Sequence, residues 1–162
     1  RDSDAQYQLG LIYQQRRNYT EAIPRFEKAR EIDPTEPDPI YQLGRIAREQ
    51  GRHQDALPLF QRCVALDDKH CSSEVWRDLG ATNFELGNTD LALAQLEKYV
   101  DRREYDPEGL YWLGQTYKRL NRDADARAMF QRSVEAAQTA PAHRRQQSAR
   151  WKSQSRSELR SL

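Results

Sequence analysis

Residues 37–63 read PDPIYQLGRIAREQGRHQDALPLFQRC, and the spacing of small and large apolar residues in this segment indicates how the chain folds. Its Leu-Gly pair is followed, twelve residues after the glycine, by an alanine, and four residues later by a large apolar residue. The same columns occur four times along the chain, with successive glycines 34, 36 and 34 residues apart. The pairs are Leu9-Gly10, Leu43-Gly44, Leu79-Gly80 and Leu113-Gly114; the alanines are Ala22, Ala56, Ala92 and Ala126; the apolar residues are Phe26, Phe60, Leu96 and Phe130. A repeat of this length indicates a stack of small supersecondary units that bury a continuous core.

Each unit is predicted to contain two helices. Apolar residues recur at three- and four-residue steps over 3–16, 37–50, 72–86 and 107–120, and again over 20–32, 54–67, 90–103 and 124–138. The first helix of each unit begins with serine or proline, which favour helix starts, and the next residue is acidic, which suits the positive end of the helix dipole. These starts are Ser3, Pro37, Ser73 and Pro107. Short polar turns separate the two helices, so we expect antiparallel hairpins.

The glycine column indicates a close approach between the two helices of each hairpin. Gly44 lies inside a predicted helix, where glycine costs about 0.5–1 kcal/mol relative to alanine. Because this cost is repeated in every unit, we expect that a side chain at the glycine would hold the two backbones apart. Cys63 falls in a core column of the second helices together with Ala29 and Ser133, which predicts a buried structural thiol and not a nucleophile.

The pattern over residues 3–140 resembles the tetratricopeptide repeat family, whose helix–turn–helix units of about 34 residues carry small and aromatic residues in these columns. The resemblance implies an all-α fold, a right-handed α-solenoid of antiparallel helix hairpins. It divides residues 1–140 into four hairpins, at about 3–36, 37–70, 73–106 and 107–140. Departures from the family pattern are Asn83 in an aromatic position, non-proline residues at 68, 104 and 138, and two extra residues near His70-Cys71-Ser72 that should lengthen one turn.

Residues 141–162 continue the register as a lone, more polar helix. Pro141 lies 34 residues after Pro107, Ser148 falls on the glycine column, and Trp151 falls on the aromatic column. We therefore expect a capping helix over 141–158 that covers the last apolar face, followed by a frayed tail. Six arginine and lysine residues accompany one acidic side chain, Glu158, in this segment, which gives it a net charge of +5. Since the whole chain has a net charge of +1, the rest carries −4.

The sequence lacks the residue constellations typical of catalysis. It contains no phosphate-binding glycine loop, no His-Glu-x-x-His helix and no nucleophile elbow. We therefore expect no enzyme, no catalytic residues, no metal and no cofactor. A metal cluster of His70 and Cys71 with Asp67 and Asp68 is less favoured than a polar loop. No apolar run approaches the roughly 18 residues of a membrane span, and no signal peptide is visible, which favours a cytoplasmic location. Since the chain starts at Arg1 and not at Met, we expect a fragment or a processed product.

The resemblance also implies that the first helices line a concave groove in which the family binds its partners. On these helices, three sets of equivalent positions are expected to point away from the second helix of the hairpin and from the Leu-Gly pairs. Packing within the hairpin alone therefore does not determine which residues occupy them. The candidate binding residues are Tyr7, Tyr41, Arg77 and Tyr111; Leu11, Arg45 and Gln115; and Arg48, Phe84 and Lys118. Tyrosines supply rigid contact area and arginine forks bind carboxylates, so we expect a protein or peptide partner with acidic groups. Alternatively, the tyrosines pack between repeats and the arginines pair with Glu49, Glu85 or Asp78.

The favoured function is therefore a non-enzymatic scaffold for protein–protein interaction, and two alternatives stay open. The chain could form a homo-oligomer, because the basic last helix of one copy could meet Asp2 and Asp4 at the start of another. The basic residues 144–160 could instead bind nucleic acid or an anionic membrane. This segment has one aromatic residue, Trp151, and no recognised nucleic-acid motif, which makes such a partner the least favoured of the three.

Overall fold

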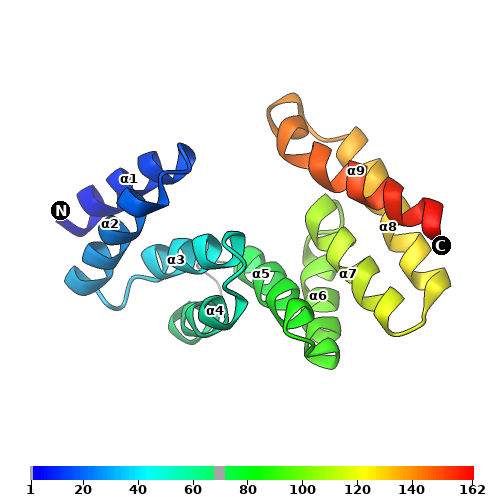
Figure 1. Cartoon of the computed structure of the whole chain (residues 1–162), viewed down its shortest axis with the longest axis horizontal. Coiled ribbons are helices and arrows are strands. Elements are labelled where there is room, and N and C mark those ends of the chain that lie inside the picture. The colour runs from blue at the N-terminus through cyan, green and yellow to red at the C-terminus, as the bar shows by residue number, and fades with distance from the viewer. Residues whose placement is uncertain (1, 68–71) are drawn as a thin grey trace. The chain divides into compact units, whose positions relative to one another are not determined.

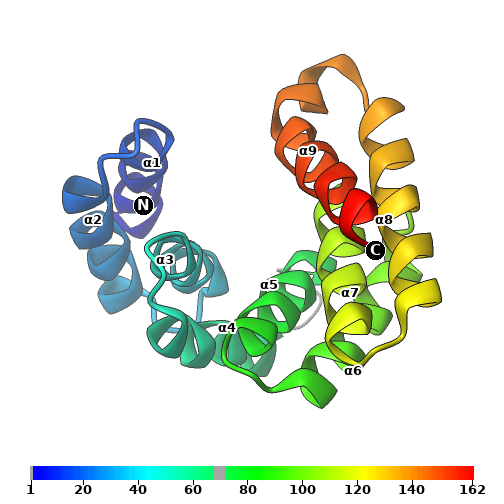
Figure 2. The same cartoon turned by 45° about the vertical axis from the view of Figure 1, so that its right-hand side comes forward.

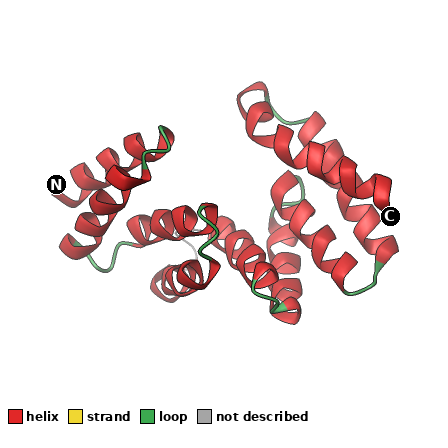
Figure 3. Ribbon diagram, viewed as in Figure 1, coloured by secondary structure: helices red, strands yellow, loops and turns green. Residues whose placement is uncertain are grey.

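The computed structural model describes residues 2–67 and 72–162, which form helices joined by short loops (Figures 1 and 3). The helices are α1 (Asp2–Gln15), α2 (Tyr19–Ile32), α3 (Pro37–Glu49), α4 (His53–Asp67), α5 (Ser72–Glu85), α6 (Thr89–Arg102), α7 (Pro107–Arg119), α8 (Asp123–Gln138), the short 3-10 helix η1 (Ala142–Arg144) and α9 (Arg145–Ser161). The described residues contain no strand. The all-α prediction is confirmed, and the bounds of the eight predicted repeat helices agree within one residue at each end. Residues 68–71, which hold most of the lengthened turn and of the disfavoured metal cluster, lie outside the described residues.

The chain divides into two compact units, residues 1–78 and 79–162, with the division inside α5. In the first unit α1 packs on α2 and α3 packs on α4, and in the second unit α7 packs on α8. Each first helix ends in the same way, with a residue of positive φ followed by a backbone N–H that donates 2.8–2.9 Å back to the carbonyl five residues earlier. The residues with positive φ are Arg17, Gly51, Gly87 and Asn121. This shared turn reverses the chain and produces the antiparallel hairpins.

The glycine column lies where the prediction requires a close approach. A Cβ atom added to Gly44 would lie 2.6 Å from a ring carbon of Phe60, and the corresponding atom on Gly114 would lie 2.7 Å from the ring of Phe130. Such distances are shorter than real Cβ contacts, so any side chain here would displace the ring. The side chains of the second helices that face the glycines are fully buried, including those of Ala56, Phe60 and Phe130. Cys63 is also fully buried, and its Sγ lies 3.5 Å from the carbonyl oxygen of Pro37, as expected for a structural thiol.

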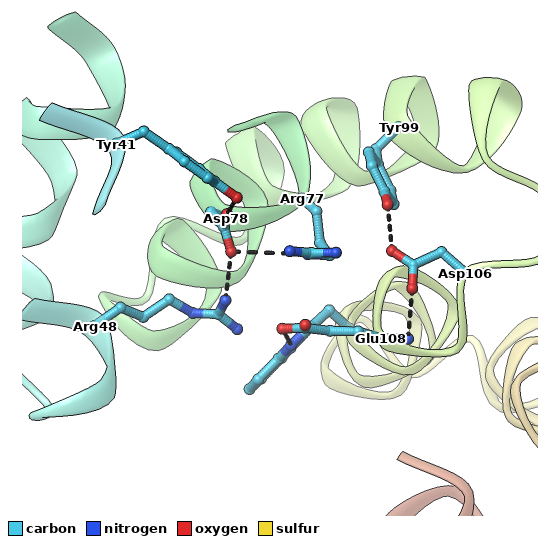
Figure 4. Close-up of polar contacts among 8 residues, drawn as sticks. Tyr41, Arg48, Arg77, Asp78, Tyr99, Asp106 and Glu108 are labelled. Atoms are coloured by element: carbon cyan, nitrogen blue, oxygen red, sulfur yellow. Dashed lines mark hydrogen bonds and ion pairs between the residues drawn. The ribbon is translucent and has the colours of Figure 1, made fainter. Parts of the chain in front are cut away.

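The start of α7 shows how a polar cap is combined with close packing (Figure 4). Asp106 accepts a hydrogen bond from the backbone N–H of Glu108 at 3.2 Å and a second one from the hydroxyl of Tyr99. The ring of Tyr99 fills the space that a side chain at Gly109 would need, since an added Cβ would lie 2.5 Å from ring carbon Cε2. A helix start, a buried tyrosine of the preceding helix and a glycine therefore depend on one another at this junction.

Helix α9 caps the second unit, where it packs along α8 and also contacts α7 (Figures 1 and 2). Ser155, fully buried, donates to the hydroxyl of Ser133 on α8 at 3.0 Å. The helix continues to Ser161, so the final residues are helical where the sequence predicted fraying. The physical reason is anchoring at the far end: Arg127 of α8 donates to the carbonyl oxygen of Leu162 at 2.9 Å, and Glu158 accepts from α7.

Removal of residues 141–162 is expected to destabilise the second unit and to expose its last apolar face. The ring of Trp151 lies 5.3 Å from that of Tyr111 and 6.0 Å from that of Trp112, measured between centroids. Without α9 these aromatic rings would face water, which is unfavourable and promotes association. We expect stronger fluorescence of a dye that binds apolar surface, and more aggregate in size-exclusion chromatography. A shorter deletion of 160–162 serves as the control. A truncated protein as stable and as monodisperse as the parent would show that α9 is an appendage.

Candidate functional site

Asp78, on α5, is a fully buried carboxylate that three predicted binding residues surround (Figure 4). The hydroxyl of Tyr41 donates to its Oδ2 at 2.5 Å, and the Nη1 of Arg48 lies 2.6 Å from its Oδ1. The Nε of Arg77 lies 3.7 Å from the same Oδ1. Tyr41 and Arg48 both come from α3, one repeat earlier, so these contacts tie the first helices of two successive hairpins together.

These contacts show what the three residues do within the first unit. The side chains of Arg48 and Arg77 are 15% and 12% exposed, and Tyr41 is buried. A carboxylate without solvent contact requires paired and hydrogen-bonded neighbours, because an isolated buried charge is strongly unfavourable. Tyr41, Arg48 and Arg77 supply these neighbours, which is the arrangement that the packing alternative describes for Asp78.

The surroundings of Tyr41 also perturb its ionisation. Burial of the phenol, and next the negative charge of Asp78, raise the pKa of Tyr41 well above its ordinary value of 10.0. The folded protein therefore holds this proton more tightly than the unfolded chain does. Its stabilising contribution is complete below about pH 10 and is lost as the pH rises through the folded-state pKa.

Tyr41→Phe is expected to reduce the loss of stability in alkaline solution. Above pH 10 the unfolded chain releases a proton that the folded protein keeps, which lowers the free energy of unfolding by at most about 1.4 kcal/mol per pH unit for one group. The substitution removes the ionisable hydroxyl. The free energy of unfolding of Tyr41→Phe should therefore decrease less steeply between pH 10 and 12 than that of the parent. Urea unfolding at stepped pH measures both slopes. Tyr105→Phe is the control for the same substitution at an exposed position, since Tyr105 is 79% exposed. Equal slopes in the parent and in Tyr41→Phe would contradict the assignment.

In the second unit, α9 covers the corresponding part of α7. Gln115 donates to the hydroxyl of Tyr111 at 2.6 Å and to Glu158 of α9 at 3.2 Å. The Nζ of Lys118 lies 2.7 Å from the carboxylate of Glu158. Tyr111 is buried and stacks on Trp151. The structure therefore brings the predicted residues Tyr111, Gln115 and Lys118 together, and their common neighbour is the capping helix.

Phe84 lies beneath Arg119, a residue that reasoning from the sequence missed. The guanidinium carbon of Arg119 lies 3.5 Å from the centroid of the Phe84 ring, and its Nη1 donates to the Phe84 carbonyl oxygen at 2.5 Å. The ring of Phe84 also packs at 5.6 Å from Trp112. In the sequence Arg119 is one of two basic residues in the last turn of α7, where a cation suits the helix dipole. The position of Arg119 in the sequence does not indicate that its guanidinium stacks on an aromatic ring of α5, the first helix of the preceding hairpin.

The other predicted binding residues of the first unit are Tyr7, Leu11 and Arg45. Arg45 is exposed on α3, with its guanidinium carbon 5.9 Å from the centroid of the Tyr41 ring. Tyr7 and Leu11 are half-buried on α1 and pack against a core cluster that includes Leu43 and Ile46 of α3. We refer to Tyr7, Leu11 and Arg45 as the α1–α3 face. Its side chains are one aromatic ring, one aliphatic chain and one guanidinium.

Within residues 2–67 and 72–162, no three histidine, cysteine, aspartate or glutamate side chains lie close enough together to hold a metal ion. Among the helices formed by these same residues, none combines the length and the apolar composition needed to cross a membrane.

Comparison with known proteins places the pattern in one family. Tetratricopeptide repeat models match residues 2–69, 36–104 and 77–141, which together span most of the chain. A search of curated protein sequences found no significant match.

Solved structures of several repeat proteins share the fold. MamA from Desulfovibrio magneticus RS-1 has a TM-score of 0.73 at 19% identity, over 99% of this chain and 96% of that one. PilF of Pseudomonas aeruginosa has a TM-score of 0.74 at 23% identity, over 99% of this chain and 70% of that one. YrrB, described as a tetratricopeptide repeat protein with an unusual peptide-binding site, has a TM-score of 0.70 at 26% identity, over 83% of this chain and 68% of that one. The fold is accordingly an α-solenoid of helix hairpins.

Proposed function

The chain belongs to the tetratricopeptide repeat family, and on that premise we propose that it is a non-enzymatic scaffold that binds a segment of a partner protein through the α1–α3 face. One observation carries the proposal. Arg45 is the one exposed side chain among the ten predicted binding residues, all of which the structure describes. The predicted residues of α7, in contrast, are hydrogen-bonded to or stacked on side chains of α9. The first unit therefore holds the predicted binding residue that is most exposed, Arg45.

The chemistry of this face favours an apolar segment with an acidic residue. Tyrosine and leucine side chains supply contact area at a low cost in conformational entropy, and the Arg45 guanidinium can bind a carboxylate with two parallel hydrogen bonds. The Tyr41 ring beneath Arg45 and the anchored Arg48 restrict the surroundings of the guanidinium. The peptide-binding site described for YrrB supports the proposal, since that protein is built from the same kind of repeat.

Arg45→Glu is expected to weaken partner binding at least tenfold, because it removes an attractive contact and adds repulsion of an acidic segment. The matched control is Arg62→Glu, the same change of charge at an exposed position on the second helix α4. A partner segment recovered by affinity capture would be titrated calorimetrically against both variants at 50 and 300 mM salt. Binding of the segment to Arg45→Glu and to the parent should converge as salt increases. Loss of binding in Arg62→Glu with normal binding in Arg45→Glu would refute the proposal.

Self-association is a second candidate, favoured by the exposed apolar side chains of α1. Leu9 and Ile12 are 38% and 46% exposed, next to the acidic first turn with Asp2 and Asp4. These residues offer an apolar and acidic surface to the basic α9 of another copy. Light scattering from 10 to 500 µM protein tests this candidate, because a mass that increases with concentration in the parent and stays constant in Leu9→Ser/Ile12→Ser would support it.

A further inference from the structure

Between the end of α8 and the start of α9 lies an open hollow of about 290 Å³. It is lined by Ala137, Gln138, Arg145, Ala149 and Lys152. The two alanines leave room between the helices, and the two cationic side chains stand on the same side of α9. We propose that this hollow binds paired carboxylates of an acidic protein segment, at a site separate from the α1–α3 face.

The start of α9 is electrostatically unlike that of the other helices. Each of α1–α8 has an acidic residue in its first turn, whereas the fully described helix α9 has none and follows directly on Arg144. An acidic residue in the first turn offsets the positive end of the helix dipole. At α9 that positive end is instead reinforced by Arg144 and Arg145, which favours an external anion beside the hollow.

The acidic side chain of α9 is already bound elsewhere. Glu158 accepts from Lys118 at 2.7 Å and from Gln115 at 3.2 Å, so it is held against α7. The exposed residues of α9 include Arg145, Arg150, Arg156 and Arg160. The Nε of Arg145 donates to the carbonyl oxygen of Ala140 at 3.3 Å, which fixes the base of its guanidinium at the edge of the hollow.

The spacing of the two cations suggests the form of the ligand. Arg145 and Lys152 are seven residues apart on one helix, a distance of about 10 Å along its axis at 1.5 Å per residue. In an extended peptide, carboxylates three residues apart are also separated by about 10 Å. A segment with acidic residues at every third position therefore matches both cations at once.

The distribution of charge favours a short acidic segment over a nucleic acid. The basic C-terminal segment has a net charge of +5, but the chain as a whole has +1, so the remaining 140 residues are net negative. A long polyanion bound at α9 would extend along residues 79–140 of the same unit, which contain 10 acidic and 8 basic residues, so repulsion would weaken its binding. A segment that occupies the hollow alone meets the cations without that repulsion.

Fluorescence anisotropy with a labelled Glu-Gly-Ser-Glu-Gly-Ser-Glu peptide tests the proposal on the full chain. We expect saturable binding at 50 mM salt, and loss of binding when every Glu of the peptide is replaced by Gln. In a separate NMR titration with the same peptide, we expect the amide resonances of Ala137, Gln138 and Ala149 to shift. Arg145→Glu/Lys152→Glu should weaken binding at least tenfold. Because Arg145 also supports the turn, Lys152→Glu alone is included and should weaken binding at least threefold.

The matched control is Arg156→Glu/Arg160→Glu, which makes the same change of charge on the same helix outside the hollow, and should alter binding less than twofold. Equal losses in the two double variants would overturn the proposal, since they would indicate diffuse attraction only. Absence of binding, or tighter binding of a 12-nucleotide single-stranded DNA than of the acidic peptide, would overturn it as well. Arg45→Glu should leave peptide binding at the hollow unchanged, so the two proposed surfaces are tested independently.

Discussion

Asp78→Ala is expected to lower the free energy of unfolding by about 3–5 kcal/mol, the range found when one partner of a buried ion pair is removed. The substitution would leave the Arg48 guanidinium, 15% exposed, and the Tyr41 hydroxyl without the carboxylate that both contact. It would also delete the link between α3 and α5. Urea unfolding followed by circular dichroism measures the effect.

The control is Asp55→Ala, which removes the carboxylate of an exposed pair with Arg52 at 3.1 Å and should cost less than about 1 kcal/mol. Asp78→Leu combined with Arg48→Met should recover part of the lost stability, because it replaces both charges with apolar groups of similar size. If Asp78→Ala unfolds at the same urea concentration as Asp55→Ala, Asp78 does not hold the two repeats together.

Gly44→Leu is expected to lower the free energy of unfolding by about 1–3 kcal/mol, as overpacking of a core does. A Cβ atom alone would already lie 2.6 Å from the Phe60 ring, and the rest of a leucine side chain would have to displace that ring or separate α3 from α4. The melting temperature by circular dichroism measures this effect. Gln54→Leu, at an exposed position of α4, is the control for adding a leucine without a clash.

A double-mutant cycle of Gly44→Ala with Phe60→Ala isolates the contact between the two side chains. The double variant should be less destabilised than the sum of the two single variants, because the new methyl group occupies space that the ring has left. Strict additivity, or an unchanged melting temperature in Gly44→Leu, would mean that the glycine column has another cause.

The repeat architecture could be predicted because the residues that recur in each repeat are determined by contacts within a single hairpin. The clash at Gly44 and the burial of Phe60 and Ala56 follow from the close approach of two helices within one hairpin. Those two helices are separated by a short turn, so the partner of each column is fixed by sequence distance. The bounds of the eight repeat helices could be read from the same periodicity.

The candidate site could be predicted only in part, because contacts between hairpins are not fixed by sequence distance. Tyr41 and Arg48 lie 37 and 30 residues from Asp78, and the sequence alone leaves Glu49 and Glu85 as equal alternatives for the arginines. In the same way, Arg119 reaches Phe84 across 35 residues. The binding role of these positions on the first helices stays a prediction, because the sequence does not distinguish a side chain that holds a neighbouring repeat from one that contacts a partner.

Binding through the first helices is tested most directly by mapping amide chemical-shift changes as the partner segment is titrated into the isotope-labelled chain. We expect the largest changes in α1 and α3, around Leu11 and Arg45, and we expect them to be lost in Arg45→Glu. Changes confined to α4 or to α9, with α1 and α3 unaffected, would contradict the claim that this chain binds its partner through the first helices of its repeats.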